Sequence, residues 1–367
     1  MTLVLVLVLL FFSCISILGV FFVYARTGDD VIENSSSSGK GGSNDGDGGG
    51  GSVSAVGLTP VPAGKDLELT ANGITIVFAK RLAGAVWNLR WKGHEFVGET
   101  MGNGGSMQSA LTYDVMVGQS SEEENPTEAG SSQDYGGKTT SKWTEAAKSA
   151  NEVFTKCQMA YYYPPGEIVA SSASKARARG KGPVSDTTIS KRVSIGYRGF
   201  PNVINYSIKF ECPGKHWFVQ HEVLTDYMPR TFNKIYTVQD GKAVAQGGNM
   251  YMSSPPNIAV PVIIAKNDST AMGVYTHTSP PNPTYKAPTS PWYTVDAKTQ
   301  SGHLPWDNGQ NPAGIVAPFT KWSVVWHGGS QLKKTERIAA THIFGIALVI
   351  GSVAECASVI GKLQRGE

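Results

Sequence analysis

Two carboxylates beside a polar loop are the first residues of this chain whose types could do chemistry. Asp114 ends a strand-like run, and Glu128 lies in the motif NPTEAG, which also contains Asn125. Cleavage of a glycosidic bond needs two carboxyl groups about 5 Å or more apart, one as acid and one as base or nucleophile. Because turns expose side chains, Glu128 is the first candidate and Asp114 the second. The alternative is that Glu128 caps its turn and Asp114 is an ordinary strand-end charge.

A second set of candidate residues lies in the run HEVLTDYMP. His221 or Tyr227 could take the C5 proton of a uronic acid while a basic residue neutralises the uronate, which is lyase chemistry. Adjacent side chains of a strand point to opposite faces, so only one of His221 and Glu222 can reach a shared cleft. The alternative is a core histidine whose hydrogen bond is satisfied internally.

Aromatic and amide side chains supply the candidate binding residues. Trp292 and Trp306 lie in a proline-rich segment, and sugar rings stack on exposed aromatic faces while polar neighbours bind the hydroxyls. Gln108 and Asn125 are the polar candidates for substrate binding. The sequence has no P-loop, no GxGxxG after a strand, no HExxH and no GxSxG, and its Cys and His residues lack metal-ligand spacing. We therefore expect neither a cofactor nor a metal.

The elements that position these residues are mostly strands. LELTANGITIVFAK alternates apolar and polar residues around an Asn-Gly turn, and ISKRVSIGYRG, NVINYSIKFEC and HWFVQHEVLTDYM follow at regular spacing. This pattern predicts an all-β fold over residues 58–367, a large antiparallel, supersandwich-like β-sandwich. SVAECASVIGKL has helical spacing and predicts a short C-terminal helix with Ser352 as its cap.

The N-terminal segment indicates the compartment. Residues 2–25 carry no charged side chain, and about 20 apolar residues can span a bilayer core. We expect residues 1–26 to form an uncleaved transmembrane signal anchor, with a cleaved signal peptide as the alternative. Residues 27–57 are rich in Gly and Ser and predict a disordered linker. The domain would then be anchored to a membrane facing the lumen or exterior, or secreted if cleavage occurs.

Three further features bear on that compartment and on the partners. Asn34, Asn205 and Asn267 begin N-x-S/T triplets, which are glycosylation acceptors in a lumenal protein. Cys157 and Cys212 lie in strand-like runs and could form a disulfide in an oxidising compartment. The charge is near balance, with 32 basic and 29 acidic residues, so we expect no nucleic-acid partner.

Several segments resemble one broad family. GAVWNLRWKGHEFV is similar to the opening strands of galactose-mutarotase-like β-sandwich domains, which often begin Gly-x-Ile/Val-x-x-Leu-x-x-x-Gly-x-Glu. MQSALTYD, NPTEAGS, QMAYYYPPGE and FVQHEVLTDYMP resemble uncharacterised secreted bacterial proteins of that type. The resemblance implies a carbohydrate ligand, and we expect a polysaccharide hydrolase or lyase acting on extracellular or lumenal glycan. A non-catalytic glycan-binding or structural surface protein is the alternative. The epimerase His and Glu pattern is not matched, so mutarotase activity is not implied.

Overall fold

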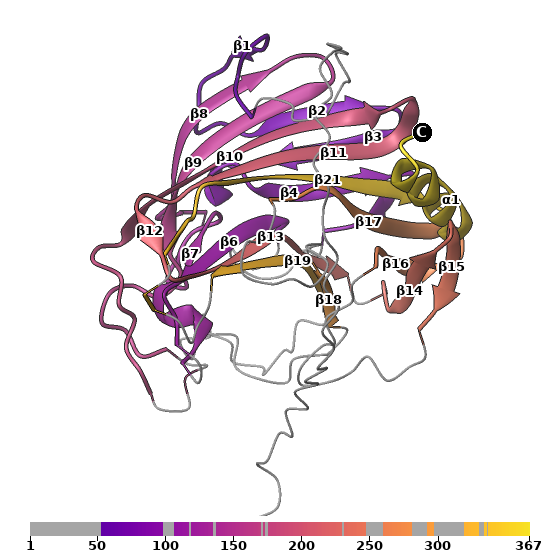
Figure 1. Cartoon of the computed structure of the whole chain (residues 1–367). Helices are drawn as coiled ribbons and strands as arrows, with labels where there is room; N and C mark the ends of the chain where they lie inside the picture. Colours follow the sequence, from indigo (N-terminus) through magenta and orange to yellow (C-terminus); the bar gives the residue numbers. More distant parts are fainter. Residues whose placement is uncertain are drawn as a thin grey trace, which may run out of the picture. The chain divides into compact units, whose positions relative to one another are not determined.

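Strand-period alternation produces one large antiparallel sheet in the computed structural model (Figure 1). The structure describes residues 53–97, 106–116, 119–134, 137–169, 172, 175–229, 231–246, 260–280, 292–296, 319–329, 334–335 and 337–367. The expected anchor and most of the linker lie outside these residues. Within them, no helix combines the length and the apolar character needed to cross a bilayer.

Thirteen strands of the described residues follow one another in this sheet. In spatial order they are β15 (Lys242–Ala245), β14 (Lys234–Gln239), β16 (Val262–Asn267), β17 (Thr270–Thr278), β21 (His342–Gly351), β11 (Phe200–Glu211), β10 (Val184–Tyr197), β9 (Glu152–Tyr161), β7 (Pro126–Thr127), β6 (Gln108–Tyr113), β13 (Phe218–Pro229), β19 (Phe319–Gly329) and β18 (Trp292–Asp296). Two more, β8 (Lys142–Lys148) and β1 (Thr59–Pro60), extend from β9. The predicted large antiparallel sandwich is confirmed.

Smaller elements complete the fold. A four-stranded sheet contains β2 (Leu67–Ala71), β3 (Ile74–Phe78), β4 (Val86–Trp91) and β5 (His94–Glu95), and β12 (Lys215–His216) pairs with β20 (Ile338–Ala339). The 3-10 helices are η1 (Lys80–Leu82) and η3 (Ser121–Glu124). Apolar side chains of the four-stranded sheet join those of β11 and β21 in one core, as Ile76, Tyr206 and Leu348 illustrate. Burial of this apolar surface is the main stabilising contribution.

The C-terminal helix α1 (Val353–Gln364) begins where the sequence predicts. The Ser352 hydroxyl accepts a hydrogen bond from the Glu355 N–H, and the Glu355 carboxylate accepts one from the Ser352 N–H, which forms a capping box. Side chains of β21 alternate between two cores, because Ile346 packs in the large core whereas Val349 packs beneath α1. Figure 1 shows α1 lying against β17 and β15.

A register shift in β13 decides which of its side chains point outward. The shift lies between Glu222 and Leu224, where β13 gains one residue relative to β19. His221 packs in the core before the shift, as its contacts with Phe210 and Phe344 show, and Leu224 and Met228 belong to the core after it. Even-numbered residues such as Glu222 therefore point outward before the shift, and odd-numbered residues such as Tyr227 point outward after it. Glu222 and Tyr227 come together for this reason.

Candidate functional site

The outward face of β6, β13 and β19 carries a row of polar side chains, which we call the polar face. Strand register places Gln220 beside His327, Thr225 beside Ser323 and Tyr227 beside Lys321. On the other flank, β6 places Thr112 beside Gln220 and Gln108 beside Thr225. The polar face therefore consists of Gln108, Thr112, Gln220, Glu222, Thr225, Tyr227, Lys321, Ser323 and His327.

The ammonium of Lys321 lies close to two other side chains of this face. Its Nζ lies 3.6 Å from Glu222 Oε2 and 5.5 Å from the centre of the Tyr227 ring. The Lys321 and Glu222 side chains are 30% and 27% exposed, so solvent reaches both. Because the Lys321–Glu222 ion pair is partly buried, its attraction is stronger than that of a fully exposed pair. Its remaining exposure leaves room for a ligand to approach.

The charges of this cluster follow from its surroundings. Burial lowers the pKa of Lys321, but the Glu222 carboxylate and the Tyr227 phenol outweigh burial and hold that pKa above its ordinary value. Burial raises the pKa of Tyr227, and Glu222 raises it further against the opposing effect of Lys321. Glu122 of η3 raises the pKa of both groups. At neutral pH the cluster therefore presents an ammonium and a neutral phenol.

A neutral imidazole lies next along the row. The Nε2 of His327 is 2.8 Å from the Gln220 side-chain oxygen, which places the ring proton on Nε2. Burial lowers the pKa of His327 to about 4, so the ring is uncharged at neutral pH. Between Glu222 and Tyr227 on β13, the buried Thr225 and Ser323 hydroxyls lie 2.8 Å apart. The polar face thus combines proton donors and acceptors with one fixed positive charge.

Glu128, the first catalytic candidate, lies inside the protein. Its carboxylate forms an ion pair with Lys191 and accepts a hydrogen bond of 3.0 Å from the Ser109 N–H. The expectation that its turn exposes this side chain is wrong, because Glu128 is buried. Glu128 and Asp114 also adjoin opposite ends of β6, separated by roughly 17 Å at strand rise. That separation exceeds the range of about 5–10 Å between paired glycosidase carboxylates, so this geometry does not favour their acid/base roles.

His221 is a core histidine. The ring is buried against Phe210 and Trp326, and its Nε2 lies 2.9 Å from His342 Nδ1. Burial lowers its pKa well below the ordinary value. His221 and Tyr227 have the same sequence parity, but the register shift sends them to opposite faces. The two side chains therefore share no cleft, and this geometry does not favour a lyase site that uses both.

The remaining candidates are spread over the structure. Gln108 lies on the polar face, where its side-chain oxygen accepts a hydrogen bond of 3.0 Å from the Ala129 N–H. The Asn125 carbonyl accepts a hydrogen bond from the Tyr162 N–H at 2.8 Å beside η3. Trp292 begins β18, where only the backbone is described, and Trp306 lies outside the described residues. The sugar-stacking role of the two tryptophans stays a prediction.

The predicted disulfide does not form. Cys157 and Cys212 are both free, and β10 lies between their strands. Two strand spacings amount to about 9.6 Å, more than the limit of about 7 Å between Cα atoms of a disulfide. Cys157 instead faces the Glu128 carbonyl, at 3.9 Å, and Cys212 faces His216.

The glycosylation candidates differ in their surroundings. Asn205 lies within β11, and its side-chain oxygen is 2.9 Å from His277 Nε2. Asn267 is exposed at the end of β16, where its side-chain oxygen accepts hydrogen bonds from the Ser269 N–H and hydroxyl. Asn34 lies outside the described residues. Glycosylation stays a prediction at all three.

Sequence reasoning missed Lys321 and His327. The segment KWSVVWHGG places Lys321, Ser323 and His327 at even spacing, and such spacing indicates one polar face of a strand. Glu222 was visible in its motif. The register shift that brings it to Tyr227 leaves no comparable signal, because no Gly or Pro marks it.

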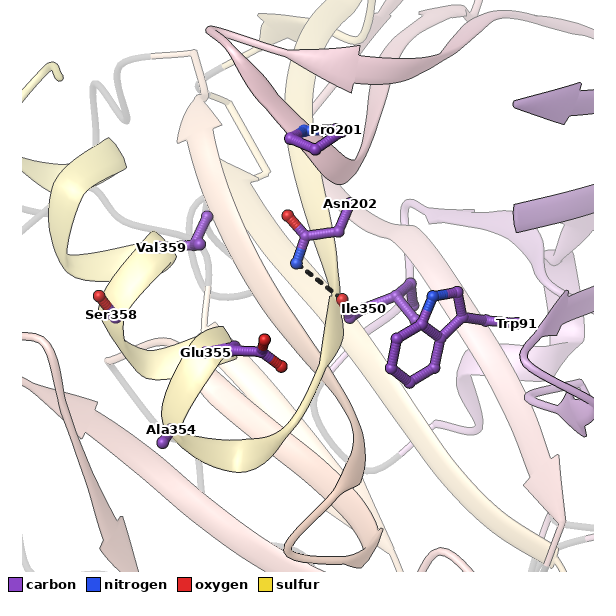
Figure 2. Close-up of a pocket in the computed structure, with 8 residues that line it drawn as sticks. All are labelled: Trp91, Pro201, Asn202, Ile350, Ala354, Glu355, Ser358 and Val359. Carbon is purple, nitrogen blue, oxygen red and sulfur yellow. Dashed lines mark hydrogen bonds between the residues drawn. The ribbon is translucent and has the colours of Figure 1, made fainter. Parts of the chain in front are cut away.

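A hollow elsewhere in the protein is less suited to a ligand. It has a volume of about 560 Å³ and lies between Trp91, the start of β11 and the first turns of α1 (Figure 2). Its Asn202 amide donates a hydrogen bond to the Ile350 carbonyl, and its Glu355 carboxylate caps the helix. Since both groups serve local structure, the polar face remains the candidate functional site.

Comparisons with known proteins leave the function open. No family model matches the sequence, and the search of curated proteins finds no match. Solved structures to which the chain has a distant likeness include an Escherichia coli K12 protein provisionally described as an aldose 1-epimerase, with 8% identity, a TM-score of 0.42, and coverage of 78% of this chain and 99% of that one. A galactose mutarotase-like protein from Lactobacillus casei ATCC 334 has 10% identity, a TM-score of 0.36, and coverage of 78% and 99%. The α-N-acetylgalactosaminidase of Bifidobacterium bifidum has 8% identity, a TM-score of 0.38, and coverage of 77% and 36%. Likenesses this distant assign no activity and no residue to this chain.

Proposed function

We propose that this protein is a carbohydrate-active enzyme that cleaves a glycan by proton transfer at the polar face. The observation that carries the proposal is the cluster in which Lys321 lies 3.6 Å from Glu222 and 5.5 Å from the Tyr227 ring, on a face that solvent reaches. Acid/base cleavage needs a donor and an acceptor in different protonation states within one site. The resemblance of the sequence to galactose-mutarotase-like domains supports carbohydrate as the substrate class.

Each residue of the cluster has a distinct role in this proposal. Tyr227 donates a proton to the leaving oxygen, because its raised pKa keeps the phenol protonated. Glu222 accepts a proton from the attacking water or from the sugar carbon. Lys321 stays cationic and stabilises the negative charge that develops beside it.

The polar face has the dimensions for an extended glycan. From Gln220 to Tyr227 it spans about 20 Å at strand rise, and the partly exposed side chains of Gln220 and His327 lie at one end of this span. Such amide and imidazole groups match sugar hydroxyls as hydrogen-bond partners. We propose that the glycan is extracellular or lumenal, in keeping with the predicted N-terminal anchor or signal peptide.

A non-catalytic glycan-binding protein is the second candidate. The partly exposed side chains of Gln108, Gln220 and His327 favour it, because binding can use these groups without the Glu222–Tyr227 pair. The two candidates share a ligand class and differ in whether the ligand is turned over.

An assay of the purified protein on a panel of polysaccharides tests the proposal. New reducing ends with ultraviolet absorption from unsaturated products would indicate a lyase, and reducing ends without that absorption a hydrolase. Glu222→Gln and Tyr227→Phe should each lower turnover at least about 100-fold while glycan binding persists. Glu211→Gln is the matched control, because Glu211 is a similarly exposed carboxylate paired with Lys209 on β11. Binding without turnover would replace the enzyme by the binding protein, and full activity in Glu222→Gln would remove the proposed site.

A further inference from the structure

A cysteine, a histidine and an aspartate form a chain of contacts away from the polar face. Cys212 Sγ lies 3.4 Å from His216 Nε2, and His216 Nδ1 lies 3.0 Å from Asp114 Oδ2. A nucleophile within hydrogen-bond reach of a base that a third group orients is the structural signature of an activated nucleophile. Asp114 directly follows β6, His216 belongs to β12, and Cys212 directly follows β11.

The contacts of His216 favour its protonated form. Nδ1 faces the Asp114 carboxylate, and Nε2 faces the Pro213 carbonyl oxygen at 3.1 Å as well as the Cys212 sulfur. A carboxylate and a carbonyl oxygen can only accept hydrogen bonds. In a neutral ring one nitrogen carries no proton, and its lone pair would face an oxygen that cannot donate. An imidazolium donates from both nitrogens, and the Cys212 sulfur lies where it can accept one of these hydrogen bonds.

Asp114 is held in place for this role. Its Oδ1 accepts hydrogen bonds from the Trp217 N–H at 2.8 Å and the Phe218 N–H at 3.4 Å, and its backbone has a left-handed φ of 52°. A non-glycine residue in this region is uncommon and is maintained by its surroundings. The Tyr113 ring packs 4.5 Å from the His216 ring and holds its plane.

The charged neighbours act on the same pair. Burial lowers the pKa of His216, but Cys212 and Asp114 outweigh burial and raise it to about 9. Arg337 Nη1 lies 4.0 Å from Asp114 Oδ2, and Arg179 Nη2 donates to the Asp114 carbonyl at 3.2 Å. Glu124 faces the pair from η3. Burial raises the pKa of its carboxyl against the opposing effects of Arg179 and Tyr113, and Asp114 raises it and His216 lowers it by smaller amounts.

We propose that Cys212, His216 and Asp114 form a reactive thiolate site whose co-reactant is a small peroxide. Cys212 is 2% exposed, whereas the side chains of His216 and Asp114 are 13% and 22% exposed. The sulfur is therefore buried next to two side chains that solvent partly reaches. Burial of the sulfur excludes a bulky acyl or glycosyl substrate. Hydrogen peroxide is of water size and needs no preformed pocket.

The reaction balances with the groups present. The thiolate sulfur attacks one peroxide oxygen, an S–O bond forms and the O–O bond breaks. The leaving hydroxide takes the proton from His216 Nε2 and becomes water. Sulfur is oxidised to sulfenic acid, the peroxide is reduced, and His216 ends neutral. Among the described residues, the other two cysteines are buried and free, and Cys157 is separated from Cys212 by a strand.

Oxidation of the native full-length protein by hydrogen peroxide tests the thiolate, with Cys157 as an internal control of equal exposure, 2%. After a peroxide pulse at pH 6 and alkylation of the remaining thiols in denaturant, the Cys212 thiol should be lost at least about tenfold faster than the Cys157 thiol, because the thiolate is the nucleophile. His216→Gln should lower the Cys212 rate to that of Cys157. Asp114→Asn should lower it too, and Asn tolerates the left-handed backbone and retains an oxygen for the Trp217 N–H. Quantitative mass spectrometry of the cysteine peptides gives each rate.

A peroxide pulse on the native protein, quenched in denaturant that contains dimedone, identifies the product, because unfolding gives dimedone access to the sulfur. The expected result is a dimedone adduct at Cys212 that His216→Gln abolishes. Equal loss of the Cys212 and Cys157 thiols, or an unchanged Cys212 rate in folded His216→Gln, would overturn the thiolate site. Rapid loss of the Cys212 thiol without a dimedone adduct would overturn sulfenic acid as the product. If His216→Gln fails to fold, as circular dichroism would reveal, Asp114→Asn decides between these outcomes.

Discussion

The ammonium of Lys191 and the carboxylate of Glu128 form an ion pair inside the protein, where their side chains are only 3% and 2% exposed. Burial raises the pKa of Glu128, and Lys191 opposes that rise. A buried charge is tolerated when it is paired and hydrogen-bonded, and the Ser109 N–H supplies a further bond to Glu128. The two residues therefore depend on each other.

Lys191→Met should destabilise the protein by about 3–5 kcal/mol at pH 7, because it leaves a buried carboxylate unpaired. Glu128 then has a folded-state pKa far above its unfolded value, so the loss should shrink as pH falls toward about 4.5. Urea denaturation at several pH values measures both effects. The control Lys209→Met removes a half-exposed partner of Glu211 and should cost no more than about 1 kcal/mol. Equal losses in the two variants would contradict the dependence of Glu128 on Lys191.

Gly361→Ala should destabilise the protein although it lies within α1. In an open helix this change stabilises by about 1 kcal/mol. Here the new Cβ would lie 2.5 Å from the Gly241 Cα in the turn between β14 and β15, and a backbone atom cannot yield cheaply. We expect a loss of about 1–3 kcal/mol in thermal or urea unfolding. Ser358→Ala, at an exposed site of the same helix, is the control and should be neutral or slightly stabilising. A stabilised Gly361→Ala protein would show that the helix and the turn are not in close contact.

Stability should fall between pH 6.5 and pH 4 because of buried neutral histidines. Burial first, and then Arg198, lower the pKa of His277 to about 4, so the folded state resists a proton that the unfolded state accepts below about 6.5. The free energy of unfolding is therefore highest above pH 6.5 and decreases as pH falls through this window. His277→Gln can retain a donor to Asn205 and should flatten the decrease in melting temperature. If the melting temperature of His277→Gln falls with pH as steeply as that of the original protein, His277 does not cause the decrease. His327 and His342 would then be the candidates, since burial also lowers their pKa values to about 4.

After denaturation without reductant, the described part of the chain should contribute three thiols that react with a thiol reagent. Cys157, Cys212 and Cys356 are free and buried. Denaturation should expose all three to a thiol reagent, and native protein should show a reductant-independent melting temperature. Peptide mapping under non-reducing conditions checks the pairing directly. A peptide that joins Cys157 to Cys212 would contradict the strand order at β9, β10 and β11.

The fold was predictable because alternation of side chains is a local property. The strands at residues 184–197, 200–211 and 218–229 and the cap at Ser352 follow from spacing alone. Strand order was not predictable, since it depends on contacts between distant segments. The Cys157–Cys212 pairing failed for this reason.

The candidate site was predictable only in part. Tyr227 and Gln108 lie on the polar face, whereas Glu128 and His221 lie in the core. Sequence alternation assigns Tyr227 to the face of His221, and one extra residue in β13 reverses that assignment. Glu128 can be buried as a charged group because it pairs with Lys191, which lies in a distant strand. The sequence around either residue does not indicate this pairing.

The position of β21 between β11 and β17 has a consequence for synthesis in the cell. Both neighbours emerge from the ribosome earlier than residues 342–351, so each keeps an unpaired backbone edge until β21 arrives. Such edges attract other strands, and slow long-range pairing prolongs the exposure. The large sheet must therefore close after translation of this strand, and a nascent chain halted before it would expose two strand edges to aggregation.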